Sequence, residues 1–115
     1  MSIQRFKIGP RMCQAVVHND TVYLAGQVAE DTTADAKGQT SQILHQIDEL
    51  LALTGTDKSK LLSATVYLSD MANFGAMNAA WEPWVDPANP PVRATVEAKL
   101  AAPKYQVEIA IIAAK

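Results

Sequence analysis

Charged side chains near the C-terminal end of the chain are the strongest candidates for chemistry. Arg93, Glu97 and Glu108 lie in two segments, 92–100 and 105–113, in which apolar and polar residues alternate. A period of two is the side-chain repeat of a β-strand. Because a guanidinium is planar and permanently charged, it can bind a carboxylate through two parallel hydrogen bonds. An arginine and two carboxylates on stiff strands could therefore form a site for a small ligand.

The two segments predict a hairpin closed by the loop 101–104. Pairing the residues that flank this loop would set Glu97 opposite Glu108, where the carboxylates would repel each other. Lys99, a bulge, a shifted register or a group from another chain would have to relieve that repulsion. Arg93 and Glu108 would share a face but lie about 13 Å apart along it. One chain alone would not easily bring both side chains to the same small ligand.

Length and composition predict one compact domain that spans residues 1–115. The hydrophobic fraction of 49% and the charged fraction of 19% are typical of a soluble globular protein. A net charge of -2 argues against a nucleic-acid-binding surface. The sequence contains no apolar run long enough to span a membrane and no charged-then-apolar leader, so we expect a cytoplasmic protein.

The residue types that commonly bind metals are scarce. Cys13 is the single cysteine, so no internal disulfide can form, and its apolar neighbours favour a packed side chain over a nucleophile. His18 and His45 have no cysteine or carboxylate at ligand spacing. We therefore expect no metal site.

The remaining elements predict an α+β fold. An amphipathic helix over 39–53 has Gly55 as its C-terminal cap, and a second helix begins after Asp70 and is kinked or ended at Pro83. Gly26, inside a predicted strand, indicates a bulge or a close approach by another backbone or a ligand. The predicted strands cover residues 2–8, 13–17, 21–28, 61–68, 92–100 and 105–113.

Two helices can cover only one face of this sheet of about six strands. The other face would carry Ala110, Ile112 and Ala114 as well as charges, which is a poor surface to expose to water. We expect this face to pack against copies of the same chain.

Several short motifs resemble the Rid (YjgF-type) family of small enamine/imine deaminases. They are Ala25-Gly26-Gln27, the segment 64–70 ahead of a helix that contains Met77-Asn78, Pro91-Val92-Arg93, and Val107-Glu108-Ile109. The likeness runs from about residue 12 to the end of the chain and keeps the order of the elements.

The resemblance implies a chorismate-mutase-like subunit in a homotrimer, with the sheets lining a central barrel and a cleft between each pair of neighbours. It also implies that Arg93 binds the carboxylate of a 2-imino or 2-amino-2-enoic acid and that Glu108 holds the attacking water. The products would be a 2-oxo acid and ammonia, without a cofactor. Because an iminium carbon is already electrophilic, positioning one water is most of the catalysis required.

Two positions depart from the pattern of many family deaminases. Met12 stands where they have a tyrosine, which would make the pocket more apolar, and Thr95 stands where they have a cysteine, although its hydroxyl can still donate a hydrogen bond. Gly26 would contribute a closely approaching backbone. Two alternatives remain open: a non-catalytic module that binds small carboxylates, and an endoribonuclease or translation inhibitor, which the acidic charge and the lack of a histidine near Arg93 disfavour.

Overall fold

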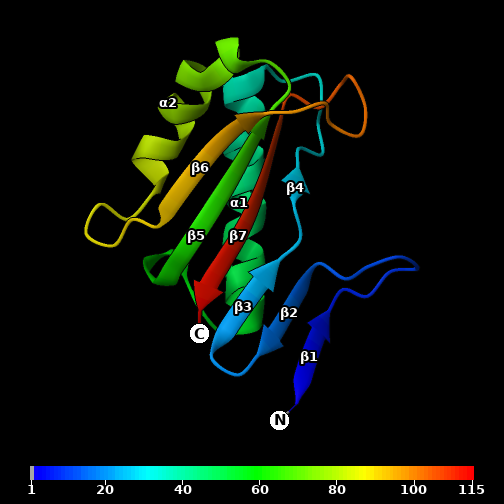
Figure 1. The fold of residues 1–115 in the computed structure, drawn as a ribbon, viewed down its shortest axis with the longest axis vertical. Coiled ribbons are helices and arrows are strands. Elements are labelled where there is room, and N and C mark those ends of the chain that lie inside the picture. Colours follow the sequence, from blue (N-terminus) through cyan, green and yellow to red (C-terminus); the bar gives the residue numbers. More distant parts are fainter. Residues whose placement is uncertain (1) are drawn as a thin grey trace.

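Strand β7 (Val107–Ala114) lies inside a mixed sheet whose strand order is β1-β2-β3-β7-β5-β6. The computed structural model describes residues 2–115 and places both α-helices on one face of this sheet (Figure 1). All strand pairs are antiparallel except β5 with β6. The short strand β4 pairs with β7 beyond the end of β3. The other elements are β1 (Ile3–Phe6), β2 (Ala15–His18), β3 (Thr21–Leu24), β4 (Gln27–Val28), α1 (Ala36–Thr54), β5 (Leu61–Leu68), α2 (Phe74–Trp84) and β6 (Val92–Glu97).

The predicted C-terminal hairpin is wrong, because β5 lies between β6 and β7. β6 ends at Glu97, and the nine residues from 98 to 106 are long enough to carry the chain past β5 to β7. β5 and β6 are joined through α2, and a crossover helix of this kind makes neighbouring strands parallel. Glu97 therefore aligns with Leu68, while Glu108 aligns with Tyr67 on the other side of β5. The two glutamates do not face each other.

The first helix follows its predicted pattern but begins earlier. Asp35 caps α1 by accepting a hydrogen bond of 2.8 Å from the Gly38 N–H, so the helix starts at Ala36 instead of Gln39. Gly55 closes it in the left-handed conformation with φ of 87°, as predicted. The side chains that it buries against the sheet include Ile43, Leu44, Ile47, Leu50 and Leu51.

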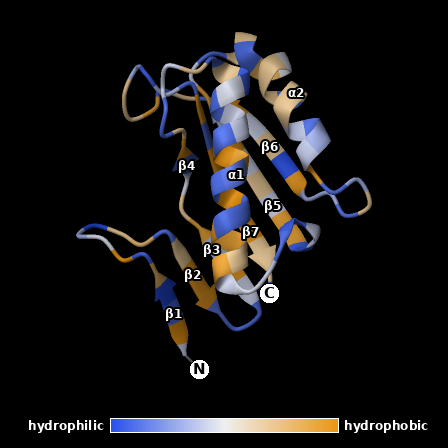
Figure 2. Cartoon of the chain, turned by 180° about the vertical axis from the view of Figure 1, so that it is seen from behind, coloured by the Kyte–Doolittle hydropathy of each residue, from blue (hydrophilic) through white to orange (hydrophobic). Residues whose placement is uncertain are grey.

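The two faces of the sheet differ as the alternation predicts. Val107, Ile109, Ile111 and Ala113 are buried beneath the helices, whereas Ala110, Ile112 and Ala114 lie on the open face. Figure 2, seen from the helix side, shows hydrophilic residues on the outer side of α1 and mainly hydrophobic strands behind it. The open face also carries large apolar side chains that remain exposed, namely Tyr23, Val92 and Val96.

The second helix is a short element with one apolar side. Asp70 caps the 3-10 turn Met71–Asn73 that precedes it, and Pro83 occupies its last turn, as the sequence predicts. Met77 and Trp81 are buried, but Phe74 at its first position stays 42% exposed. Within residues 2–115, neither α1 nor α2 combines the length and apolar character that crossing a membrane requires.

Candidate active site

Arg93 lies on β6, the last strand of the sheet, and turns toward α2. Its Nη1 donates a hydrogen bond of 2.8 Å to Asn78 Oδ1. The guanidinium carbon lies 5.3 Å from the centre of the Trp81 ring and 5.9 Å from that of Phe74, within the range of cation–π attraction. Met77 Sδ lies 3.8 Å from the same nitrogen. One helix face therefore holds the arginine in place.

The charge of this arginine has no acidic partner in direct contact. Among the described residues, no carboxylate oxygen lies within 4 Å of the guanidinium. Burial lowers the pKa of Arg93, while the more distant charge of Glu82 raises it. Because arginine remains protonated at neutral pH, the site presents a half-buried positive charge whose other N–H groups are free to bind an acid.

Thr95 belongs to the same group as Arg93. It follows two residues later on β6 and aligns with Val66, a buried residue on the helix-facing side of β5. Its Oγ1 is buried and has no hydrogen-bond partner in residues 2–115. A buried hydroxyl without a partner is costly, so it is a natural position for a ligand to accept or donate a hydrogen bond.

Glu108 and Gly26 form a second group. Glu108 projects from the open face of β7, and a Cβ built on Gly26 would lie only 2.2 Å from its Oε2. Between Tyr23 and Gln27 the chain advances four residues while β7 advances three, from Ile112 to Ile109, which is the signature of a β-bulge. The predicted bulge at Gly26 is therefore confirmed, and the group that approaches this glycine is the Glu108 side chain, where the sequence suggested a backbone or a ligand.

The two groups lie on opposite faces of the sheet. Arg93 aligns with Ala64 and Glu108 with Tyr67, on the two sides of β5. Two strand spacings and three residues along the strand separate their Cα atoms by about 14 Å. The prediction that both share a face is wrong, because it depended on direct pairing of β6 with β7. The expectation that one chain alone would not easily bring both to the same small ligand agrees with this separation.

Met12 does not contact the Arg93 guanidinium or the space beside Gly26. It lies in the loop between β1 and β2 and is 52% exposed. The backbone of this loop is tied by a hydrogen bond of 2.7 Å from the Gly9 N–H to the Met12 carbonyl. A role for Met12 in substrate binding stays a prediction.

Sequence reasoning missed the partners of Arg93 on α2. Phe74, Asn78 and Trp81 recur at helical spacing, and this spacing places them on one face of the helix. An asparagine on the same helix face as two aromatic residues was the signal that this face also meets a polar group.

Gln39 is a second residue that the sequence did not reveal. Its side chain is fully buried, and its Nε2 lies 3.2–3.4 Å from the carbonyl oxygens of Thr32, Ala34 and Lys104. Its Oε1 accepts a hydrogen bond of 2.9 Å from the Gln106 N–H. This amide fixes the segment that leads into β7, two residues before Glu108.

Clusters suited to a metal ion are not found in the described part of the chain. No group of three or more histidine, cysteine, aspartate or glutamate side chains gathers within residues 2–115. The His45 side chain on α1 is 76% exposed, and its Nε2 lies 3.3 Å from Glu49 Oε1.

The fold is that of a chorismate-mutase-like α+β protein, with a mixed sheet and two helices on one of its faces. The family model described as "Endoribonuclease L-PSP" matches residues 3–115. The chain belongs to this family, which is also called the Rid, YjgF or RutC family.

Individual relatives agree over nearly the whole chain. A RutC family protein of Haemophilus ducreyi is 48% identical over 112 residues, which cover 97% of this chain and 96% of that protein. The crystal structure of the YjgF-family protein NMB1025 from Neisseria meningitidis is 42% identical, with a TM-score of 0.96 and coverage of 100% of this chain and 96% of that chain. A more distant relative is the chloroplastic Reactive Intermediate Deaminase A of Arabidopsis thaliana. It is 29% identical over 112 residues, which cover 92% of this chain and 59% of that protein.

Proposed function

We propose that the protein is a hydrolytic deaminase of reactive 2-imino and 2-amino-2-enoic acids, which it converts to 2-oxo acids and ammonia. Arg93 binds the substrate carboxylate, and Glu108 orients the water that attacks the imine carbon. Thr95 supplies a hydroxyl and Gly26 a close backbone. The observation that carries the proposal is the half-buried Arg93 guanidinium, which has no acidic partner within 4 Å in the described residues.

Arg93 suits a carboxylate for physical reasons. One of its nitrogens is occupied by Asn78, and the ring contacts from α2 limit its motion, so little side-chain freedom is lost when a ligand binds. Its remaining N–H groups can form two parallel hydrogen bonds to an acid. Partial burial strengthens these bonds, because less water competes for the charge.

Glu108 suits the activation of water. A carboxylate accepts hydrogen bonds only, so it can orient a water molecule and take up its proton as the water attacks. The iminium carbon is electrophilic without help from a metal or a covalent nucleophile. The missing Cβ of Gly26 leaves the space that the Glu108 carboxylate occupies.

The site is expected to form between subunits. Because Arg93 and Glu108 emerge on opposite faces about 14 Å apart in one chain, each would act with its counterpart from a neighbour. The open apolar face of the sheet favours association with other copies, and a homotrimer that encloses this face is the assembly we propose. The name of the Arabidopsis relative supports deaminase chemistry.

Two other functions make different predictions. A module that only binds small carboxylates would need Arg93, whose supporting contacts all come from the same chain. Such a module would show saturable binding without turnover. The family model's description names an endoribonuclease. A net charge of -2 and the lack of a histidine among the contacts of Arg93 within residues 2–115 disfavour RNA cleavage by this chain.

The direct test supplies freshly generated 2-aminoacrylate to the purified protein and follows pyruvate. We expect faster pyruvate formation than in buffer and its loss in Arg93→Ala. Arg5→Ala, on the exposed edge strand β1, is the matched control and should retain full activity. No acceleration by the wild type would refute the deaminase proposal. Pyruvate binding that Arg93→Ala abolishes, without turnover, would support the binding module.

A mixing experiment tests the intersubunit site. Arg93→Ala and Glu108→Gln chains are each expected to be inactive alone. After unfolding and refolding together in equal amounts, about a quarter of the clefts in randomly mixed trimers would combine an intact arginine with an intact glutamate. Recovery of about that fraction of wild-type activity is expected. If the mixture stays as inactive as its components, the two residues do not act across a subunit boundary.

A further inference from the structure

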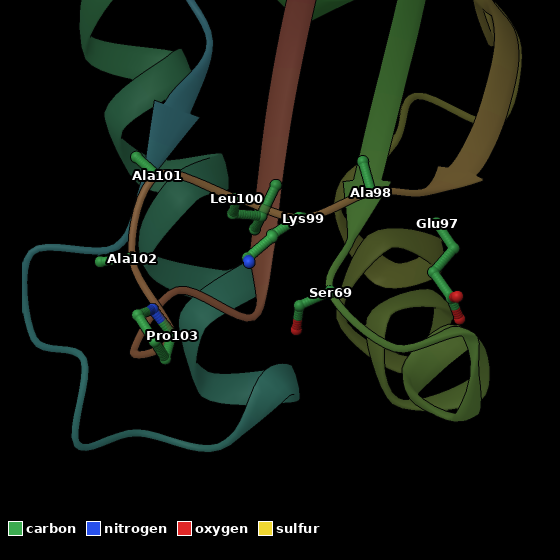
Figure 3. Close-up of a pocket in the computed structure, with 8 residues that line it drawn as sticks. All are labelled: Ser69, Glu97, Ala98, Lys99, Leu100, Ala101, Ala102 and Pro103. Carbon is green, nitrogen blue, oxygen red and sulfur yellow. The ribbon is translucent and has the colours of Figure 1, made fainter.

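The segment that crosses from β6 to β7 forms a groove that the proposed deaminase site does not use. Residues 98–103 make one wall, and the side chains of Ser69 and Glu97 complete it, with a cavity volume of about 540 Å³ (Figure 3). We propose that this groove binds a small molecule with an anionic head group and an aliphatic body. None of the site residues Arg93, Thr95, Gly26 and Glu108 lines it.

Lys99 provides the charge for the head group. Figure 3 shows its ammonium directed into the groove, between Ser69 and the turn that contains Pro103. Within residues 2–115 this ammonium makes no ion pair. The other charged side chain, Glu97, is already engaged, because its Oε2 accepts a hydrogen bond of 2.8 Å from the Met71 N–H. The formal charges of Glu97 and Lys99 cancel, but the carboxylate is held beside Met71, so the ammonium is the charged group that a ligand in the groove would meet.

The backbone of the wall adds further donors. Hydrogen bonds anchor it at both ends, from the Ala98 N–H to the Leu68 carbonyl at 2.9 Å and from the Tyr105 N–H to the Ala102 carbonyl at 3.1 Å. Between these anchors, the N–H groups of residues 99–102 donate to no protein acceptor in the described part of the chain. The anchors fix the wall, and the N–H groups between them are left to water or to a ligand.

The body of the ligand follows from the apolar part of the lining. Leu100, Ala98, Ala101 and Pro103 offer hydrocarbon surface beside the Lys99 ammonium (Figure 3). The volume falls within the range of ordinary small-molecule sites, about 300–1,000 Å³. An unbranched chain of about six carbons with one carboxylate or phosphate would place its head on Lys99 and its tail on the alanine and leucine side chains.

The test measures binding in the Arg93→Ala background, so that a carboxylate bound at the proposed deaminase site cannot contribute. Hexanoate, hexyl phosphate, hexylamine and hexanol are titrated separately into the isotope-labelled protein, and amide shifts are followed by NMR. We expect saturable shifts at residues 98–103 with the two anions and not with hexylamine or hexanol. The tighter of the two anions identifies the head group.

Two lysine variants decide whether the groove is responsible. Lys99→Met keeps the aliphatic stem and removes the charge, and it should weaken anion binding at least tenfold. Lys104→Met is the matched control, because the Lys104 ammonium lies 5.3 Å from the centre of the Tyr105 ring and outside the groove lining, and it should bind as the parent does. Equal affinities in the two variants, equal binding of hexylamine, or no saturable shift at millimolar anion would overturn the proposal. Because Arg93 is absent throughout, these outcomes are independent of whether the protein is a deaminase.

Discussion

Replacing Gly26 with alanine would test the role of Glu108 without altering the carboxylate chemically. The added Cβ would lie 2.2 Å from Glu108 Oε2, 3.0 Å from Cδ and 3.2 Å from Cγ, and all three atoms belong to the flexible end of that side chain. Restoring normal contact requires the carboxylate to move by about 1 Å. A misplacement of this size can cost about a hundredfold in rate.

The effect of Gly26→Ala on stability should be small by comparison. Overpacking costs about 1 kcal/mol when a flexible side chain can yield. Among the described residues, Gly55 is the one glycine in the left-handed region, so alanine can adopt the backbone conformation of Gly26. Alanine also restricts the unfolded chain, which adds about 0.4–1 kcal/mol to the free energy of unfolding. We expect the melting temperature to change by no more than about 4 °C.

The assay compares kcat and KM for pyruvate formation from 2-aminoacrylate. In Gly26→Ala, kcat should fall about a hundredfold, while KM stays near the wild-type value because the added Cβ meets only the Glu108 side chain and leaves the guanidinium that binds the substrate carboxylate in place. Gly75→Ala, in α2, is the matched control, since a Cβ there meets no atom within 4 Å. A Gly26→Ala protein with wild-type kcat, or one whose loss appears only in KM, would refute the reasoning.

Three further substitutions separate positioning from stability. Asn78→Ala removes the 2.8 Å hydrogen bond to Arg93 and should raise KM about tenfold or more, because hydrogen bonds to charged groups contribute about 1.5–3 kcal/mol. An unchanged KM in steady-state kinetics would contradict this role. Thr95→Val removes a buried hydroxyl that has no partner in residues 2–115, so the free energy of unfolding in urea should rise by about 1 kcal/mol while kcat/KM falls about tenfold. A loss of both stability and kcat/KM would argue against a ligand at this hydroxyl. Gln39→Leu strands buried carbonyl and N–H groups and should cost about 3 kcal/mol in urea unfolding, and a loss below about 1 kcal/mol would show that these groups find other partners.

Local patterns predicted the elements well but not the partner of each strand. Alternation along 107–114 identified the buried face of β7, and the spacing of Ile43, Ile47 and Leu51 identified α1. The pairing of β6 depends on whether residues 98–106 turn back at once or cross β5. That choice is decided by the crossover through α2, which no short window of sequence contains.

The candidate site shows the same division. The residue types of Arg93 and Glu108 were sufficient to select them, and Gly26 was correctly associated with a bulge. Their faces could not be predicted, because inserting one strand between two others changes the alignment of every residue. Asn78 was missed since a polar residue on a buried helix stripe gives no sign of which strand it meets.

The position of β6 at the end of the sheet has a consequence for solubility. Its outer backbone groups have no strand partner among the described residues, and Val92 beside them is 73% exposed. Such a border can recruit strands from other molecules and seed fibrils. Pro90 and Pro91 precede the strand, and Glu97 ends it. Prolines withhold the N–H groups that a growing fibril needs, and a charge at the far end repels stacked copies of itself, so these flanks act as gatekeepers against aggregation.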